Sequence, residues 1–424
     1  MIIEHRSSLR GEITVPGDKS ISHKAILLGS LANGVSEVDG IFMSEDCLST
    51  INCFRKMGVR IEIQSNNKVK IRGNGLNGLT EPTSPLNTGK SNTALRLLLG
   101  VLVGQKFNTI VTRDESVQRK LVSDMVKPLK FMGANIIGRE DASMCPLSIA
   151  PSTLLAKTHE LGLENRYVKS SILLASLYTE GKTTIKERVP YRNHTELMLN
   201  YFGANISRRR NSIISHKCNE LNAQHVIVPG DISIAAYFVV AACIVPHSEI
   251  LIKNVGFNPT RNGLIEVLSN MGAKIDILNE HMVGQEVVAD IHVSSSELSG
   301  ISVNGSIIPR LYDELPALMV AACAASGKTT ISGLTGYKIN EIGLLDKLSN
   351  ELIKMGAKIT KTQDCIEIEG GKPLIGRIVE SYNNKTLTLA LSTAGMYADG
   401  ETLIRKSQIL DTTFPDFLPV LNSL

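Results

Sequence analysis

The sequence predicts a two-domain α/β protein built from six copies of one supersecondary unit, and three observations lead to that prediction. The chain has 424 residues, more than a single hydrophobic core usually serves. Two short phrases recur along it with a period of roughly 70 to 85 residues. Within each period, apolar runs of helical length alternate with β-rich runs. Together these features favour two domains of three units each.

The first repeated phrase is Met or Phe, then Gly, then Ala or Val, then any residue, then Ile. It begins at Met57, Met132, Phe202, Met271 and Met355. A glycine directly after an apolar helical run is typical of a left-handed helix cap. Each phrase therefore predicts the end of a helix and the beginning of a strand.

The second phrase is an alanine- or leucine-rich run, a turn, and a run rich in threonine, isoleucine and valine. Its six turns fall at Gly34, Gly104, Gly181, His247, Gly327 and Gly400. Glycine at the turn again predicts a left-handed cap. The segments that follow, such as 182–186 and 328–332, are predicted strands. The sixth copy ends before its Met-Gly phrase.

The tetrapeptide Val-Pro-Gly-Asp occurs twice, at 15–18 and 228–231, and each copy is followed after one residue by Ser-Ile and a small-residue helix. A single Pro-Gly dipeptide commonly marks a turn. Two copies with matching flanks favour crossings of the chain between domains, which we expect near 14–19 and 228–232.

Composition excludes several classes of function. The net charge is only +4, and the charged residues are spread along the chain. This argues against a surface that binds nucleic acid or a membrane. The chain start lacks an apolar signal segment, and the longest apolar run, 235–246, is about 12 residues, too short to span a bilayer. We therefore expect a cytoplasmic protein. The seven cysteines form no CxxC pair, so we expect reduced core residues and no metal site.

A cluster of polar residues lies where a strand is expected to end and a helix to begin. It contains Lys19, Ser20, Ser22, His23 and Lys24. Backbone N–H groups at a helix start, together with hydroxyls and cations, suit phosphate or carboxylate. A plainer interpretation makes Ser20 a helix cap and the lysines solvated charges. This segment alone leaves both interpretations open.

Three further segments carry polar groups, and two of them lie at expected helix starts. Residues 89–93 open an apolar helix, and Arg119 and Lys120 are further candidate donors to the same anion. Asp313 and Glu314 precede Leu-Pro and an alanine-rich helix. That position stabilises an ionised carboxylate, whether it acts on a substrate or only caps the helix.

Five motifs are spread over the chain: Val-Pro-Gly-Asp-Lys-Ser-Ile-Ser-His-Lys at 15–24, Arg-Asn-His-Thr-Glu at 192–196, Asn-Pro-Thr-Arg-x-Gly at 258–263, Asp-Glu-Leu-Pro at 313–316 and Phe-Pro-Asp-Phe at 414–417. Through them the whole chain resembles the EPSP synthase family of enolpyruvyl transferases. The resemblance implies a two-domain inside-out α/β barrel with three βαβαββ units per domain. In that fold the first strand joins the second half, so the expected domains are 14–229 and 1–13 combined with 230–424.

The resemblance also implies an activity of the shikimate pathway, which leads to aromatic amino acids. The enolpyruvyl group of phosphoenolpyruvate (PEP) would pass to the 5-hydroxyl of shikimate 3-phosphate, with no metal or organic cofactor. Lys19 and Ser20 match the family's ligand-binding pair, and Lys19 is also expected to serve catalysis. Asp313 matches its proton acceptor, and Glu341 the acidic residue of its second catalytic run. The expected partners are small anionic substrates, and the expected state is a monomer.

The PEP side departs from the family pattern. Asn340 stands where the family has a catalytic lysine, Leu344 where it has a PEP-binding arginine, and Thr412 where it has another lysine. Asn92 occupies the place of a glycine whose backbone closely approaches PEP. The second catalytic run therefore lacks two positive charges, at Asn340 and Leu344. The side chain of Asn92 is expected to enter the space that PEP occupies in the family.

Other substitutions change how anions can be held. Lysine replaces arginine at Lys24, Lys120 and Lys385, which keeps the charge and loses the bidentate fork. The family's Ser-x-Gln run, which helps to hold shikimate 3-phosphate, corresponds to Asn165, Arg166 and Tyr167. Arg166 remains a candidate phosphate ligand.

Three functional interpretations stay open on the sequence. The favoured one is an EPSP synthase-like transferase with a strongly altered PEP site, insensitive to glyphosate, an inhibitor that occupies the PEP site in this family. The second is a diverged enzyme of specialised metabolism that acts without PEP, for example by elimination, on shikimate 3-phosphate or a related cyclitol phosphate. The third is a non-catalytic binding protein.

Overall fold

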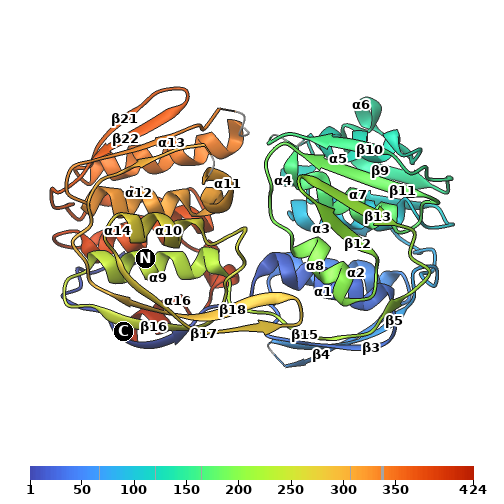
Figure 1. The fold of residues 1–424 in the computed structure, drawn as a ribbon, viewed down its shortest axis with the longest axis horizontal. Coiled ribbons are helices and arrows are strands. Elements are labelled where there is room, and N and C mark those ends of the chain that lie inside the picture. Colours follow the sequence, from blue (N-terminus) through green and yellow to red (C-terminus); the bar gives the residue numbers. More distant parts are fainter. Residues whose placement is uncertain (66, 120, 164, 306, 336–338) are drawn as a thin grey trace. The chain divides into compact units, whose positions relative to one another are not determined.

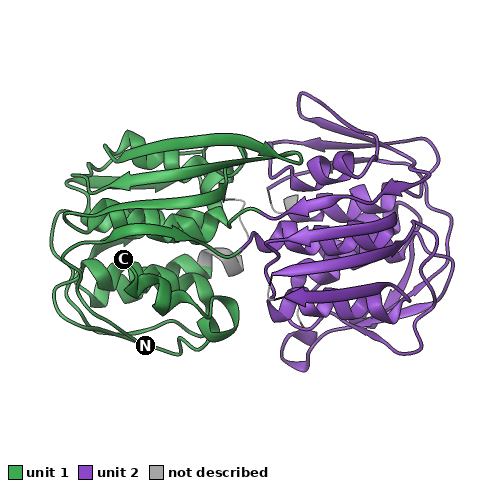
Figure 2. Ribbon diagram, turned by 90° about the horizontal axis from the view of Figure 1, so that it is seen from below, with its two compact units in different colours: residues 1–16, 229–424 green, residues 17–228 purple. Residues whose placement is uncertain are grey.

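The protein is described from a computed structural model, which covers residues 1–65, 67–119, 121–163, 165–305, 307–335 and 339–424. The side chains of Arg166 and of residues 339–342 also lie outside the described part. The chain divides into two compact units (Figures 1 and 2). Residues 17–228 form one, and residues 1–16 together with 229–424 form the other.

One strand order recurs in five of the six described sheets. A first strand runs parallel to a second, the second pairs antiparallel with the last strand of a hairpin, and the other hairpin strand lies at the edge. In three of these sheets a helical segment joins the first two strands, and in the other two the first strand comes from a distant part of the chain. In all five a helix leads into the hairpin. This is the predicted βαβαββ unit, and its presence in both halves of the chain confirms the repeat.

Residues 17–228 contain three of these sheets. Their strands are β3 (Ala32–Asp39), β4 (Arg60–Ser65), β5 (Lys68–Asn74), β14 (Leu221–Asn222) and β15 (His225–Ile227) in one; β6 (Leu86–Asn87), β7 (Thr109–Thr112), β8 (Asn135–Gly138) and β9 (Met144–Ala150) in the next; and β10 (Thr158–Leu161), β11 (Lys182–Glu187), β12 (Ile206–Arg209) and β13 (Ser212–His216) in the third. The helices are α1 (Lys19–Leu31), α2 (Glu45–Lys56), α3 (Asn92–Leu102), α4 (Glu115–Gln118), α5 (Ser123–Phe131), α6 (Arg139–Ala142), the 3₁₀ helix η1 (Arg166–Val168), α7 (Lys169–Ser176) and α8 (His194–Tyr201).

The other unit has two complete sheets and one incomplete sheet. Its strands are β2 (Arg10–Thr14), β16 (Glu249–Gly256), β17 (Lys274–Val283) and β18 (Glu286–Ser294); β19 (Ser302–Val303), β20 (Lys328–Ser332), β21 (Lys358–Lys361) and β22 (Cys365–Glu369); and β1 (Ile2–Ile3), β23 (Ile378–Glu380) and β24 (Thr402–Arg405). Its helices are α9 (Ile232–Ile244), α10 (Gly263–Asn270), α11 (Ile308–Leu311), the 3₁₀ helix η2 (Tyr312–Glu314), α12 (Leu315–Ala324), α13 (Ile339–Lys354), α14 (Lys385–Tyr397), α15 (Ile409–Thr413) and α16 (Phe417–Asn422).

The N-terminal residues complete this second unit. β2 pairs parallel with β16, and β1 pairs antiparallel with β24. The sixth repeat, which lacks a hairpin of its own, therefore receives a strand from the start of the chain. The predicted strands at 182–186 and 328–332 are confirmed as β11 and β20.

Each Met-Gly phrase ends a helix, as predicted. The Met or Phe is buried at all five positions, and the glycine after it has a φ between +87° and +99°. A left-handed residue there lets the chain turn from helix into strand without the steric cost that a side chain would add.

The turn phrase follows the prediction at five of its six positions. Gly34, Gly181, Gly327 and Gly400 are left-handed, and so is His247. The expectation was wrong for Gly104, which does not adopt a positive φ. A side chain at Gly104 would instead meet the ring of Tyr178 at 2.2 Å, so close packing requires glycine there.

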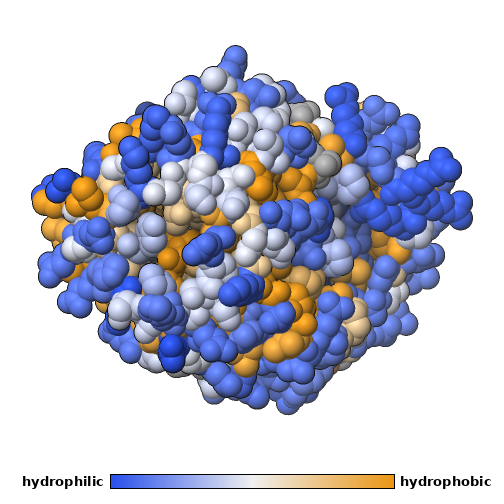
Figure 3. Space-filling view, turned by 60° about the vertical axis from the view of Figure 1, so that its left-hand side comes forward, coloured by the Kyte–Doolittle hydropathy of each residue, from blue (hydrophilic) through white to orange (hydrophobic). Residues whose placement is uncertain are grey.

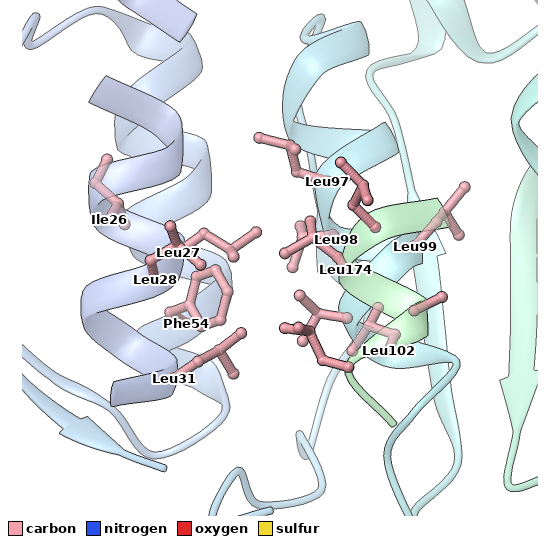
Figure 4. Packing of buried hydrophobic residues seen from close by; sticks show 14 of the residues in the cluster. Ile26, Leu27, Leu28, Leu31, Phe54, Leu97, Leu98, Leu99, Leu102 and Leu174 are labelled. Atoms are coloured by element: carbon pink, nitrogen blue, oxygen red, sulfur yellow. The ribbon is translucent and has the colours of Figure 1, made fainter. Parts of the chain in front are cut away.

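Helices form the centre of each unit and sheets its outside (Figure 1). α1, α3 and α7 pack together in one unit, and α9, α12 and α14 in the other. All residues of α9 except Ser233 are buried, as expected for a helix that is apolar around its circumference. Figure 4 shows Leu27 and Leu31 of α1, with Phe54 of α2, facing Leu98 of α3 across the core.

The surface carries no large uniform apolar face in the view of Figure 3, where apolar and polar residues alternate. Ile2, Met282 and Ile378 are among the exposed apolar residues of the unit that contains both chain ends. Scattered exposure of this kind is ordinary. Among the described residues, no helix is long and apolar enough to cross a membrane.

Candidate functional site

The first candidate site lies at the N-terminus of α1. This helix begins directly after Asp18, whose carboxylate caps it by accepting a hydrogen bond from Ile21 N at 2.9 Å. Lys19 and Ser20 are the first two helical residues, and both are half-buried. The positive end of the helix dipole lies here. The predicted strand-to-helix anion site therefore has the helix N-terminus that it requires.

Two lysines add positive charge at this helix end. Lys24 is buried, and its Nζ donates to Ser20 Oγ at 2.6 Å and to the Ser20 carbonyl at 3.2 Å. Lys19 forms an ion pair with Asp46 in the first turn of α2. An anion that binds Lys19 must therefore compete with a carboxylate. The sequence reasoning missed Asp46, although an acidic pair after a serine cap was visible at 44–46.

His23 contributes no charge to this environment at neutral pH. Its side chain is fully buried, with Nδ1 2.8 Å from Thr50 Oγ1. Burial, followed by the charges of Lys19 and Lys24, holds the pKa of the imidazole well below its ordinary value of 6.5. The local positive charge comes from the lysines.

A second group of residues surrounds the start of α3. The predicted helix begins here, and Ser91 caps it by accepting from Ala94 N at 3.1 Å. Asn92 Oδ1 accepts a hydrogen bond from Arg113 Nη2 at 2.7 Å. Arg113 is 3 % exposed, and its Nε and Nη1 have no hydrogen-bond partner among the residues described. Asn92 is thus a principal partner of a buried guanidinium, whose pKa burial lowers.

Of the two basic residues predicted to assist this site, the structure describes one. Arg119 ends α4 and is exposed. Lys120 lies outside the described residues.

The segment that replaces the expected Ser-x-Gln run leads into α7. The ring of Tyr167 lies 5.6 Å from the guanidinium carbon of Arg96 and meets the ring of Tyr191 edge-on at 5.6 Å. Arg192 lies 5.6 Å over the ring of Tyr191. These separations suit cation–π and aromatic attraction. Arg96, Tyr167, Tyr191 and Arg192 therefore form a continuous stack, which we call the tyrosine stack. Asn165 is half-buried beside it.

A buried ion network supports the tyrosine stack. Lys169 is 2 % exposed, and its Nζ lies 2.9 Å from carboxylate oxygens of both Glu187 and Glu196. The same Nζ donates to the carbonyl of Tyr191 at 3.0 Å, and Arg208 pairs with Glu187 at 2.5 Å. Burial raises the pKa of Glu187 in spite of these cations. The sequence reasoning missed this network. The available signal was a lysine at the start of a helix that is otherwise made of serine and apolar residues.

The other unit carries the predicted carboxylates. Asp313 is half-buried in η2, directly before α12. Glu314 is 1 % exposed, and its Oε1 accepts from Ser233 Oγ at 2.5 Å and from Arg261 Nη2 at 3.3 Å. Arg261 also lies 3.6 Å from Asp231, the cap of α9. Glu314 is the N-cap residue of α12, which confirms the prediction of a carboxylate at this helix N-terminus. The hydrogen bonds from Ser233 and Arg261 give the Glu314 carboxylate a structural role.

The remaining predicted residues of this unit lie on three helices. α13 begins with a turn that contains Asn340 and Glu341, whose side chains lie outside the described part. Leu344, one turn later, is half-buried. Lys385 is the first residue of α14 and is half-buried. Thr412 is exposed on α15, where its Oγ1 donates to the carbonyl of Ile409 at 3.2 Å.

The C-terminal Phe-Pro-Asp-Phe motif anchors α15 and α16. Phe414 and Phe417 lie 5.7 Å apart, and each contacts the ring of Phe238 in α9, at 6.3 Å and 6.1 Å. Aromatic groups in such geometry add to the burial of their apolar surface. The motif therefore has a packing role that fixes the segment carrying Thr412.

Metal and thiol chemistry find no support in this geometry. The described part of the chain contains no group of three or more His, Cys, Asp or Glu side chains placed to hold a metal ion. All seven cysteines are free, and five are buried. Burial raises the pKa of Cys47 to about 12, which disfavours its reactive thiolate.

Comparison with known proteins covers the whole chain. A family model described as EPSP synthase (3-phosphoshikimate 1-carboxyvinyltransferase) matches residues 3–421. A protein of Thermoanaerobacter sp. (strain X514) named 3-phosphoshikimate 1-carboxyvinyltransferase is 45 % identical over 422 residues, 100 % of this chain and 99 % of that one. A protein of the same name from Desulforamulus reducens is 41 % identical, with 100 % and 99 % covered.

Solved structures agree with the sequence relatives. The EPSP synthase of Acinetobacter baumannii superimposes with a TM-score of 0.91 at 37 % identity, over 100 % of this chain and 97 % of that one. This likeness confirms the predicted two-domain inside-out α/β fold.

Proposed function

This chain belongs to the EPSP synthase family of enolpyruvyl transferases, and from that premise we propose that it transfers the enolpyruvyl group of PEP to the 5-hydroxyl of shikimate 3-phosphate. The hydroxyl oxygen forms a bond to the substituted vinyl carbon of PEP, and the bond from that carbon to the phosphate oxygen breaks. Inorganic phosphate leaves. The reaction requires a base for the hydroxyl proton, an acid for the PEP methylene, and cations for the anionic groups.

The observation that carries this proposal is the α1 N-terminus. Lys19, Ser20 and Lys24 stand at a capped helix end with no acidic residue in its first turn. We assign these three residues to the phosphate or carboxylate of a substrate. The pairing of Lys19 with Asp46 keeps the lysine side chain near the helix end before an anion arrives.

We assign the segment Asn165, Arg166 and Tyr167 to the cyclitol side of shikimate 3-phosphate. The tyrosine stack supports this assignment, because it holds an aromatic wall rigidly beside two guanidinium groups. Rigid placement of binding groups limits the conformational entropy lost when a ligand binds.

We assign Asp313 the role of base for the 5-hydroxyl. Glu314, its neighbour, is an unsuitable base because Ser233 and Arg261 already hold its buried carboxylate. Lys19 and Glu341 complete the proposed catalytic set. Proton transfer and charge stabilisation suffice for this chemistry, so the proposal includes no cofactor.

We further propose that the PEP half of the site is weakened. Asn340, Leu344 and Thr412 supply no positive charge, and a lost hydrogen bond to a charged group costs about 1.5 to 3 kcal/mol. Lys120 and Lys385 supply charge without the bidentate geometry of arginine. Asn92, held by Arg113, adds bulk. PEP and glyphosate should therefore both bind weakly.

The same substitutions favour a second candidate function. An enzyme that acts on shikimate 3-phosphate or a related cyclitol phosphate by elimination would keep Lys19 and Asp313 and would have no use for the cations missing at Asn340, Leu344 and Thr412. Turnover with PEP separates the two candidates.

The substrate half of the proposal is tested by thermal unfolding in the presence of shikimate 3-phosphate. A ligand at 100 times its Kd stabilises the native state by about 2.7 kcal/mol, which corresponds to a shift of several degrees in Tm at roughly 2 to 4 °C per kcal/mol. We expect such a shift for the wild type. Lys19→Gln should lose most of it, whereas Lys56→Gln, at an exposed lysine of the same unit, should retain it. No shift at millimolar ligand in the wild type would contradict the assignment of the α1 site.

A further inference from the structure

A strained turn lies directly before α14. Tyr382 and Asn383 are consecutive non-glycine residues in the left-handed region, with φ of 54° and 53°. This conformation is costly for residues with side chains and persists only where surrounding contacts enforce it. Asn384 follows the turn, and its Oδ1 caps α14 by accepting a hydrogen bond from Leu387 N at 3.1 Å. Lys385 comes next and is the first residue of α14.

The buried carboxylate of Glu351 in α13 holds this turn. Glu351 is fully buried, and its Oε1 accepts a hydrogen bond from the Tyr382 hydroxyl at 2.9 Å. Its Oε2 accepts from Glu380 N at 3.1 Å, and Lys354 Nζ donates to both oxygens. A carboxylate removed from water requires donors of this kind. Glu351 thus ties α13 to the turn through both a side chain and the backbone.

Two more contacts fix the turn from other directions. The Nζ of Lys347 lies 4.8 Å from the centre of the Tyr382 ring. Ser381, fully buried, donates from Oγ to the carbonyls of Arg405 and Lys406 at the end of β24. The hydrogen bond to Glu351 raises the pKa of the Tyr382 phenol, so the hydroxyl remains a donor.

We propose that Tyr382 is a positioning residue, which acts through Glu351 to fix the start of α14, and with it Lys385, relative to α13. The inference rests on the proposed function, in which Lys385 and the first turn of α13 serve PEP. Tyr382 itself contacts no substrate in this account. Because a displacement of about 1 Å can cost 10²-fold in a reaction, a strained turn that is over-determined by contacts has a functional reason to exist.

The test is Tyr382→Phe, which keeps the ring over Lys347 and removes only the hydroxyl. Tyr201→Phe is the matched control, because it also removes one tyrosine hydrogen bond, to the His225 carbonyl at 2.9 Å, in the other unit. We expect Tyr382→Phe to raise KM for PEP about tenfold and to leave KM for shikimate 3-phosphate unchanged. The control should change neither constant. If Tyr382→Phe changed the KM for PEP and the KM for shikimate 3-phosphate equally, Tyr382 would have only a general structural role, and the proposal would be overturned.

Hydrogen exchange provides a second readout that does not depend on turnover. The amides of Asn384, Leu387 and Thr388 are hydrogen-bonded within the turn and cap. They should exchange faster in Tyr382→Phe than in the wild type, by about tenfold or more, a rate change that one lost hydrogen bond can account for. The double variant with Glu351→Gln should show less than the sum of the two single effects. Unchanged exchange at these amides would overturn the positioning role, whereas absence of turnover in the wild type would refute the proposed function alone.

Discussion

Replacing the proposed base should have the largest effect of any single substitution. We expect Asp313→Asn to lower kcat by about 10² or more, because a positioned general base contributes roughly that factor. Asparagine keeps the size and the hydrogen-bonding shape of the side chain and removes its capacity to accept a proton. The Kd for shikimate 3-phosphate should therefore change little. Single-turnover kinetics with saturating substrates, paired with calorimetry, measures the two quantities separately.

Glu314→Gln is the matched control for this substitution, since it changes the adjacent carboxylate. Glu314 is buried and bonded to Ser233 and Arg261, so its loss should act mainly on stability, by about 1 to 3 kcal/mol. Activity retained by Asp313→Asn would refute the assignment and would move the role of base to Glu341.

Restoring the family residues at the weakened PEP positions should produce the second large effect. The variant combines Asn92→Gly, Asn340→Lys, Leu344→Arg and Thr412→Lys. Since each recovered charge-assisted hydrogen bond is worth about 1.5 to 3 kcal/mol, we expect PEP affinity to rise by roughly 10² or more. Glyphosate affinity should rise with it. Calorimetry in the presence of shikimate 3-phosphate measures both.

Single substitutions should each give less than the combination, because effects on one ligand are not additive. Asn92→Gly alone carries a specific penalty. It removes the side-chain acceptor of buried Arg113, and a buried donor left unsatisfied costs about 1 to 3 kcal/mol of stability. Thermal unfolding of each variant separates this cost from a change in affinity. If one substitution recovers as much affinity as four, the four positions do not form one weakened site.

The repeated features were predictable because they are local. A Met-Gly phrase encodes a helix end within five residues, and all five such glycines are left-handed in the structure. The cap of α1 was assigned to Ser20 in the plainer interpretation, and this was wrong, because Ser20 lies inside the helix and Asp18 caps it. Asp18 and Asp231 each accept a hydrogen bond from an amide two or three residues later. The conformation of Gly104 was not predictable in this way. Glycine is required there because a side chain would collide with the ring of Tyr178, and no local sequence pattern encodes that contact.

The contacts that arrange the candidate site were not predictable in the same way. The sequence predicts Asn92 beside the ligand, and it does not indicate that the Asn92 side chain accepts a hydrogen bond from Arg113, 21 residues further along the chain. The ion pair of Lys19 with Asp46 spans 27 residues, and Lys169 meets Glu196 on another helix. Such partners depend on tertiary packing, and one sequence does not specify which charges meet.

The central claim, that this chain is an EPSP synthase with a weakened PEP site, is tested most directly by mixing the wild-type protein with shikimate 3-phosphate and PEP and measuring inorganic phosphate. We predict phosphate release that requires both substrates, with half-saturation by PEP at or above about 1 mM, the upper end of ordinary KM values. No phosphate release while shikimate 3-phosphate still stabilises the protein would contradict the transferase function. Half-saturation at micromolar PEP would contradict the weakened site.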